Sequence, residues 1–229
     1  MFNISAILFF LTSRFFASNK TCFSSKEKGD AIANALIISS MLCFSSSFQL
    51  ITNPLFSNNI FKSLKIPGIE ETVVTPPNII FKDKMDIYVG EYHLELIHVK
   101  GHTDGDLFIY IEALKTLITG DLILNKRIPY MGEAYIEDWI KAINYMGDLN
   151  AEIYIPGHGD PGGKPVLIAM KHYLIELRQM VENQIKNGSS LTETQDAVRP
   201  KLKAKYSNWE KLEWLDGNIK RAYREFSLK

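Results

Sequence analysis

Hydrophobic and polar positions in the middle of the chain alternate with the period of β-strands. Across residues 92–99, Tyr92, Leu94 and Leu96 alternate with a histidine and a glutamate, which predicts a strand with one buried face. Other short apolar runs are bounded by Pro, Asp and Gly in the manner of strands. They lie at residues 79–81, 85–89, 107–111, 116–118 and 152–155.

The pattern changes to a helical period in the second half of the chain. Apolar residues recur at helical spacing across residues 135–149, and residues 165–185 form a long amphipathic pattern that stops near Gly188. Ser190 and Glu193 have the spacing of a capping box, which predicts the start of another helix. The alternation of strands with helices predicts a layered α/β or α+β sandwich.

The first 60 residues carry few chemical signals. They are rich in Phe, Ser and Asn, contain no histidine, and include one helical patch at residues 26–38. The apolar run Ile4–Leu11 is far shorter than the roughly 20 residues that a membrane-spanning helix needs, and Arg14 follows the run instead of preceding it. We therefore expect no membrane span and a cytoplasmic protein, with a secretory signal at residues 1–18 as the alternative.

Composition limits the classes of partner. The chain has 229 residues, of which 46% are hydrophobic and 23% charged, as in ordinary globular proteins. The 26 basic residues equal the 26 acidic ones, so no net positive charge attracts nucleic acid or an anionic membrane. The two cysteines, Cys22 and Cys43, are too few for a disulfide framework and are expected to be inert buried thiols.

Three short segments each place a metal-ligand side chain beside glycine after a predicted strand. His102 lies in Gly-His-Thr-Asp-Gly-Asp, Asp121 in Thr-Gly-Asp, and His158 in Pro-Gly-His-Gly. Zinc accepts imidazole nitrogen and carboxylate oxygen, and rigid turns at strand ends can hold such groups in fixed geometry. These three residues are the predicted metal ligands; the alternative is a degenerate site that keeps its turns for structural reasons.

Neighbouring polar residues have simpler expected roles. Asp104 and Asp106 are expected to accept backbone hydrogen bonds that shape the turn around the first ligand. His98 is expected to pack in the core or to support a ligand, and His93 lies on the other face of the same strand. His172 is expected on the surface of the long helix.

The three ligand segments, in this order and each after a strand, resemble the later motifs of the metallo-β-lactamase-fold superfamily. The resemblance covers about residues 75–173 and includes glyoxalase II and lactamase-like zinc hydrolases. It implies an αββα sandwich in which His102 and His158 bind different zinc ions and Asp121 bridges both as the catalytic residue. Trp139 occupies a position where such hydrolases often place an aromatic residue. The implied substrate is a small-molecule ester, thioester or lactam-like compound.

The upstream signature of that superfamily, His-x-His-x-Asp-His, has no counterpart, because none of the five histidines precedes His93. Residues 13–20 and 24–31 resemble the stretch that ordinarily follows this signature, so we expect the fold to be incomplete at its N-terminus. Each metal would then keep two ligands instead of three, which predicts weak and labile zinc binding. The expected organisation is an atypical segment 1–12, a partial metallo-β-lactamase-like domain 13–185 and a helical extension 186–229.

Three functional hypotheses follow. The first is a zinc-dependent hydrolase of this superfamily, although His and Asp ligands also suit iron or manganese. The second is a non-catalytic relic or binding module with a degenerate metal site, which would self-associate through an exposed sheet edge. The third is a nuclease or phosphodiesterase, which the neutral net charge disfavours.

Overall fold

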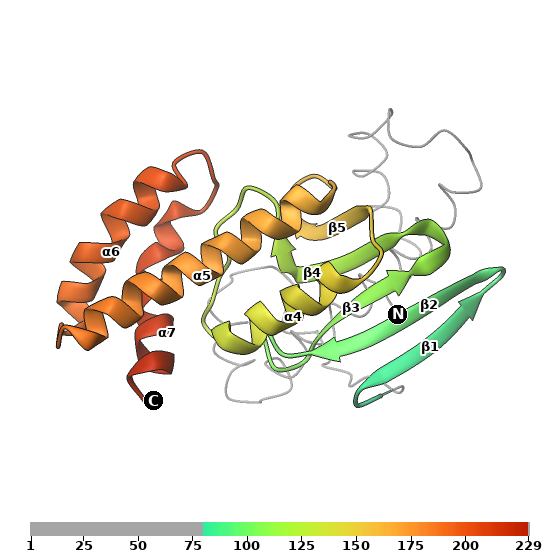
Figure 1. The fold of residues 1–229 in the computed structure, drawn as a ribbon, viewed down its shortest axis with the longest axis horizontal. Helices are drawn as coiled ribbons and strands as arrows, with labels where there is room; N and C mark the ends of the chain where they lie inside the picture. The colour runs from blue at the N-terminus through green and yellow to red at the C-terminus, as the bar shows by residue number, and fades with distance from the viewer. Residues whose placement is uncertain (1–79, 229) are drawn as a thin grey trace, which may run out of the picture.

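The computed structural model describes residues 80–228, in which five strands form one mixed sheet in the order β1-β2-β3-β4-β5. The first four strands pair antiparallel, and β5 adds parallel to β4 (Figure 1). The strands are β1 (Lys84–Val89), β2 (Tyr92–Val99), β3 (Asp106–Ile111), β4 (Thr116–Leu124) and β5 (Ile153–His158).

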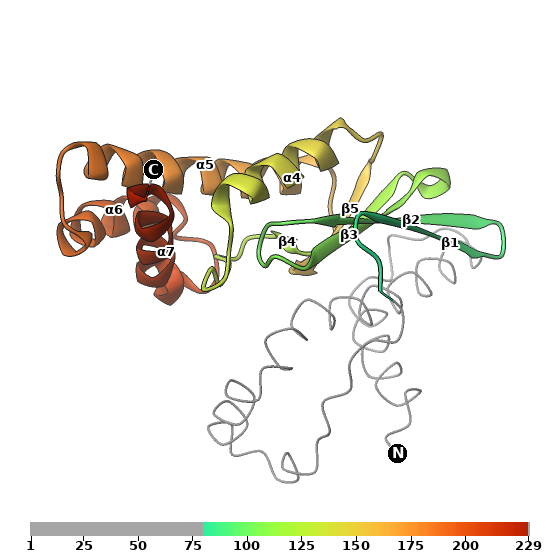
Figure 2. The ribbon, with the colours of Figure 1, turned by 90° about the horizontal axis from the view of Figure 1, so that it is seen from below.

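Helices cover one face of this sheet and extend beyond its end. In the two ribbon views, α4 and the first part of α5 lie across the sheet, whereas α6 and α7 pack around the far part of α5 (Figures 1 and 2). No helix within residues 80–228 is both long enough and apolar enough to cross a membrane. The helices are α4 (Ile136–Asp148), α5 (Lys164–Lys186), α6 (Leu191–Lys205) and α7 (Leu215–Ser227), with short 3-10 helices η2 (Glu112–Leu114) and η3 (Leu212–Trp214).

Both faces of the sheet are apolar. In β3, Phe108 and Tyr110 belong to the core shared with the helices, whereas Ile109 and Ile111 belong to a second cluster on the opposite face. Continuous burial of this kind is typical of a sheet that lies inside a layered fold. The α+β class predicted from the alternation of strands and helices is confirmed.

The strongest periodic patterns predicted their elements closely. The strand at residues 92–99 and the helices at 135–149 and 165–185 are confirmed to within about one residue at each end. The capping box is also confirmed, because the Ser190 hydroxyl accepts a hydrogen bond from the Glu193 backbone N–H while the Glu193 carboxylate accepts from the Ser190 N–H.

Other predictions need correction. Residues 80–81 are not in a strand, and Ile79 lies outside the described residues. The strands predicted to end at residues 118 and 155 continue to Leu124 and His158, so the second and third ligand segments lie within strands. Strand β4 continues through Gly120 because this glycine, with φ of 51°, forms a bulge that shifts the register without ending the strand pairing. The predictions for residues 1–12, the helical patch 26–38 and the two cysteines fall outside the described residues.

Candidate functional site

Asp121 and His158 are brought together by parallel pairing of β4 with β5. The His158 Nε2 atom lies 3.6 Å from the Asp121 Oδ1 atom, and the two side chains are 48% and 40% exposed. The pairing register joins Gly120 to Pro156 and Leu124 to His158, which places both groups toward the carboxyl ends of the two strands. The pair is therefore accessible from solvent while its backbone is fixed by the sheet.

Glycine at position 157 allows this close approach. A Cβ atom on Gly157 would lie 2.1 Å from Asp121 Oδ1 and 2.7 Å from the Gly120 carbonyl carbon, both inside van der Waals contact. No other residue fits there without displacing the Asp121 carboxylate or the backbone beside it. The positive φ of Gly120 supplies the bulge that turns the following aspartate toward β5.

The turn that carries His102 is shaped by a buried carboxylate. Asp106 accepts hydrogen bonds from the Thr103 N–H at 2.9 Å and from the Thr103 hydroxyl at 2.7 Å. Burial raises the pKa of Asp106, and the bonds from Thr103 oppose that rise. The His98 Nε2 atom hydrogen-bonds to the Asp104 carbonyl at 2.9 Å. The expected turn-shaping role of Asp106 is confirmed. His98 bonds to the turn backbone at Asp104, and the expectation that it supports a ligand stays a prediction.

Trp139 joins this turn to β4. Its ring is fully buried and lies edge-on to the His102 ring, with 5.6 Å between centroids and an interplanar angle of 81°. Its Nε1–H donates to the Leu122 carbonyl at 2.8 Å, one residue after Asp121. A Cβ atom on Gly101 would meet the side chains of Leu122 and Trp139 at 2.4 and 3.2 Å, so glycine is needed for this packing too.

The donors fit zinc in type but fall short in number within the described residues. His102 and the Asp121 region of β4 are linked through Trp139, whose ring contacts the His102 ring and whose indole N–H donates to the Leu122 carbonyl. Nevertheless, no three His, Cys, Asp or Glu side chains in residues 80–228 lie close enough together to form a metal-binding group. The structure therefore joins Asp121 to His158 directly and places His102 in the adjacent turn.

The sequence model of the family described as "Metallo-beta-lactamase superfamily" matches residues 45–158, which include all three candidate ligands. The chain belongs to the metallo-beta-lactamase superfamily. No curated protein matches the chain.

Solved structures of this superfamily resemble the chain in fold. A metallo-beta-lactamase family protein from Thermus thermophilus is 18% identical over 80% of this chain and 64% of its own length, with a TM-score of 0.52. A metallo-beta-lactamase from Pontibacter korlensis is 23% identical over 46% of this chain and 52% of its own, with a TM-score of 0.42. A sec-alkylsulfatase from Pseudomonas sp. is 19% identical over 68% of this chain and 27% of its own, with a TM-score of 0.49.

The chain spans less than two thirds of the length of each of these three proteins. The likeness to the Thermus thermophilus protein shows the fold alone, because the sequence identity is only 18%. Superfamily membership therefore establishes a hydrolase fold, while substrate and metal dependence are matters for proposal.

Asn125 lies beside the candidate ligands, and sequence reasoning gave it no role. Its backbone N–H donates to the His158 carbonyl at 2.9 Å, and its side-chain amide donates to the Asp160 carbonyl at 2.8 Å. Gly159, with φ of 85°, packs its α-carbon against the Asn125 backbone. Asn125 thus fixes the turn after His158 from the end of β4. The asparagine and the Gly-His-Gly turn are each visible in the sequence, but their pairing across 33 residues is not.

The remaining histidines and Tyr130 lie apart from the candidate ligands. His172 is exposed on α5, as predicted. His93 hydrogen-bonds to Asp86 at 2.7 Å on the surface of β1 and β2. Tyr130 packs edge-on to Trp214 of η3, with 5.8 Å between ring centroids.

Proposed function

We propose that His102, Asp121 and His158 bind zinc and that the chain contributes them to hydrolysis of a small-molecule ester, thioester or lactam-like substrate. The main support is the convergence of the Asp121 carboxylate and the His158 imidazole at 3.6 Å, half-exposed at the ends of neighbouring parallel strands. Solvent exposure of both groups lets a metal and a small substrate reach them. Membership of a superfamily of hydrolases adds to this support.

The chain's own residues would bind and orient the reacting groups. Asp121 supplies a carboxylate in a fixed position because β5 packs its glycine backbone directly against it. His102 supplies an imidazole whose ring is held by Trp139 and whose turn is held by Asp106. When bound at such a site, zinc lowers the pKa of a water molecule to about 7 and polarises a carbonyl group.

This proposal requires further ligands from outside residues 80–228. All five histidines of the chain are described, so residues 1–79 contain only carboxylates and thiols as additional donors of the kinds zinc accepts. A second polypeptide is another possible source of histidine ligands. With the described donors alone, zinc binding should be weak and readily reversed.

A second candidate function is a non-catalytic binding module. It is favoured by the absence of a three-donor group within residues 80–228. Such a module would keep the strand-end turns because they stabilise the sheet, as Gly157 and Asp106 do through their contacts.

Zinc titration of the full 229-residue chain separates these candidates. We expect wild type to bind zinc, His102→Ala and His158→Ala to bind it at least about tenfold more weakly, and His172→Ala to match wild type because His172 is exposed on α5. Hydrolysis of ester, thioester and lactam chromogenic substrates would then be measured with and without added zinc. Equal, negligible binding by wild type and the two site variants would favour the binding module.

A further inference from the structure

We infer that Glu225 of the C-terminal helix α7 is a positioning residue that sets the His102 turn through the start of α4. Its significance for catalysis rests on the proposed function, but its effect on His102 does not. Three contacts connect the two residues, and each involves a different group on α4 or next to it.

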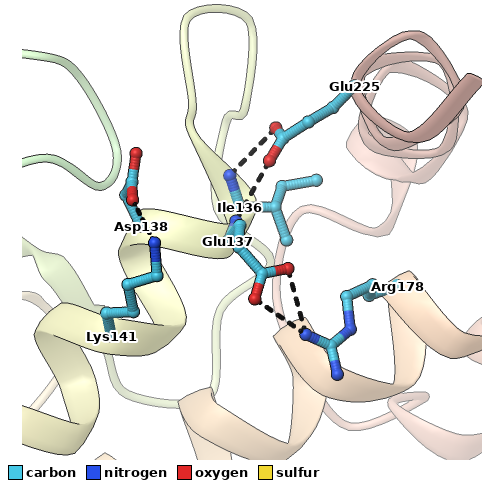
Figure 3. Close-up of polar contacts among 6 residues, drawn as sticks. All are labelled: Ile136, Glu137, Asp138, Lys141, Arg178 and Glu225. Carbon is cyan, nitrogen blue, oxygen red and sulfur yellow. Dashed lines mark hydrogen bonds and ion pairs between the residues drawn. The ribbon is translucent and has the colours of Figure 1, made fainter. Parts of the chain in front are cut away.

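The first contact is a cap supplied from a distant part of the chain. The Glu225 carboxylate accepts hydrogen bonds from the backbone N–H groups of Ile136 and Glu137, both at 3.0 Å (Figure 3). Tyr135, the residue before α4, makes no capping bond with its side chain. Because the first N–H groups of a helix have no partner within the helix, Glu225 satisfies two of them and places its negative charge at the positive end of the helix dipole.

The second contact passes from the start of α4 to the backbone of the His102 turn. The Tyr135 N–H donates to the Gly101 carbonyl at 2.8 Å, immediately before His102. The Tyr135 ring also contacts two cationic side chains. Lys100, which precedes the His102 turn, has its Nζ atom 5.3 Å from the ring centroid, and the guanidinium of Arg221 on α7 lies 5.8 Å from it. Arg221 in turn lies 3.4 Å from the Glu225 carboxylate, so the cap and the tyrosine are linked.

The third contact is the Trp139 ring on the His102 ring. The Trp139 backbone N–H donates to the Tyr135 carbonyl at 2.8 Å, so this tryptophan belongs to the first turn of the helix that Glu225 caps. Fraying or rotation of that turn would displace both the backbone and the ring that hold His102. The Asp121–His158 pair is held by strand pairing instead and should not respond.

A local effect can be separated from loss of the fold. Arg178 of α5 pairs with Glu137 at 3.1 Å, which ties α4 to α5 without Glu225 (Figure 3). Asp216 is an acidic residue at the other end of α7, where it pairs with Arg199 of α6 at 3.0 Å. Loss of either carboxylate removes one ion pair from α7, but only loss of Glu225 uncaps α4.

The test is NMR of the histidine ring protons in the full chain without metal, with the His102 signal assigned from His102→Ala. We expect Glu225→Ala to move the His102 signal toward its unstructured position as the Trp139 ring-current effect is lost. Glu225→Gln should move it less, because an amide oxygen still accepts one of the two bonds. Asp216→Ala should leave it unchanged, and the His158 signal should remain fixed in every variant.

Zinc titration of the same variants distinguishes this inference from the proposed function. We expect Glu225→Ala to weaken zinc binding by about tenfold, as is common when a group that orients a ligand is removed. If the His102 signal moves but wild type binds no zinc, the inference holds and the proposed function fails. An unmoved His102 signal in both Glu225 variants, or an equal movement in Asp216→Ala, would overturn the inference even if zinc binds. Should Glu225→Ala not fold, Glu225→Gln alone decides.

Discussion

The His102 turn and the Asp121–His158 pair belong to one candidate site but are stabilised in different ways. The turn is fixed by side chains, namely the buried Asp106 carboxylate, His98 and the Trp139 ring. The pair is fixed by backbone, through parallel strand pairing and the close approach of Gly157 to Asp121. Substitutions should therefore disturb one half of the site without the other, and four experiments test that separation.

Trp139→Ala should have the largest effect. Removing a fully buried tryptophan leaves a cavity and an unpaired Leu122 carbonyl, so we expect the free energy of unfolding to fall by about 4 kcal/mol. The His102 NMR signal should move while that of His158 stays in place. Trp209→Ala is the control, because Trp209 is part-buried and packs its ring against those of Tyr173 and Tyr206. Urea denaturation measures stability, and equal movement of both histidine signals would contradict the separation.

Gly157→Ala should affect the other half of the site. The added methyl group would overlap Asp121 Oδ1, so β5 or the carboxylate must shift, at a cost of about 3 kcal/mol. We expect the His158 signal to move and the His102 signal to remain. Gly217→Ala is the matched control, since nothing lies within 4 Å of its new Cβ and alanine favours a helix. A Gly157→Ala variant as stable as Gly217→Ala would show that the close approach is not required.

Asn125→Ala should have a smaller effect on the same half. Loss of the amide bond to the Asp160 carbonyl should reduce stability by about 1 kcal/mol, because that carbonyl is near the surface and can bind water. The turn after His158 should loosen, which amide hydrogen exchange at residues 157–160 would detect. Asn187→Ala, at the exposed end of α5, serves as the control. Unchanged exchange would indicate that the Asn125 backbone bond alone is sufficient.

The pH dependence of stability should report on Asp106 and be the smallest of the four effects. Burial raises the pKa of the folded-state carboxyl above its usual 3.8, so the folded protein holds this proton more tightly than the unfolded chain does. Stability from this group is therefore present below pH 3.8 and is lost as pH rises through the folded-state pKa. In urea titrations from about pH 3.5 to about pH 7, wild type should lose stability relative to Asp106→Asn as pH rises. The opposite slope would mean that the Thr103 bonds outweigh burial.

Local patterns predicted much of the fold but only part of the site. The alternation across residues 92–99 and the apolar spacing of α4 identified those elements, because each depends on which residues face one core. The ends of β4 and β5 were predicted too early, because glycine signals a turn locally whereas here parallel pairing carries the strands through Gly120 and Gly157. Local spacing in the sequence determines which residues share a core face. It does not determine the pairing of β4 with β5, because α4 separates these strands in the sequence.

The sequence predicted three candidate ligands, each beside a glycine. In the structure, Asp121 and His158 lie on the paired strands β4 and β5, and His102 lies in the turn between β2 and β3. Their supports were harder to predict. Asp106 was expected to shape its turn because it lies close to His102 in the sequence, within reach of local hydrogen bonds. Asn125 and Glu225 could not be assigned, because each acts on groups that are distant in the sequence, 35 residues away for the Asn125 amide and 89 for Glu225.

The capping of α4 by Glu225 also bears on synthesis of the chain. A ribosome releases His102, Asp121 and α4 before α7, so the first turn of α4 emerges without its cap. Asn218 of the same late helix donates to the Pro129 carbonyl at 2.9 Å across 89 residues, so the loop before α4 also gains a bond only after α7 has been made. Contacts between such distant residues form slowly. The His102 turn can therefore form its local bonds to Asp106 and His98 early in synthesis, whereas the Glu225 cap on α4 becomes possible only after α7 has been made.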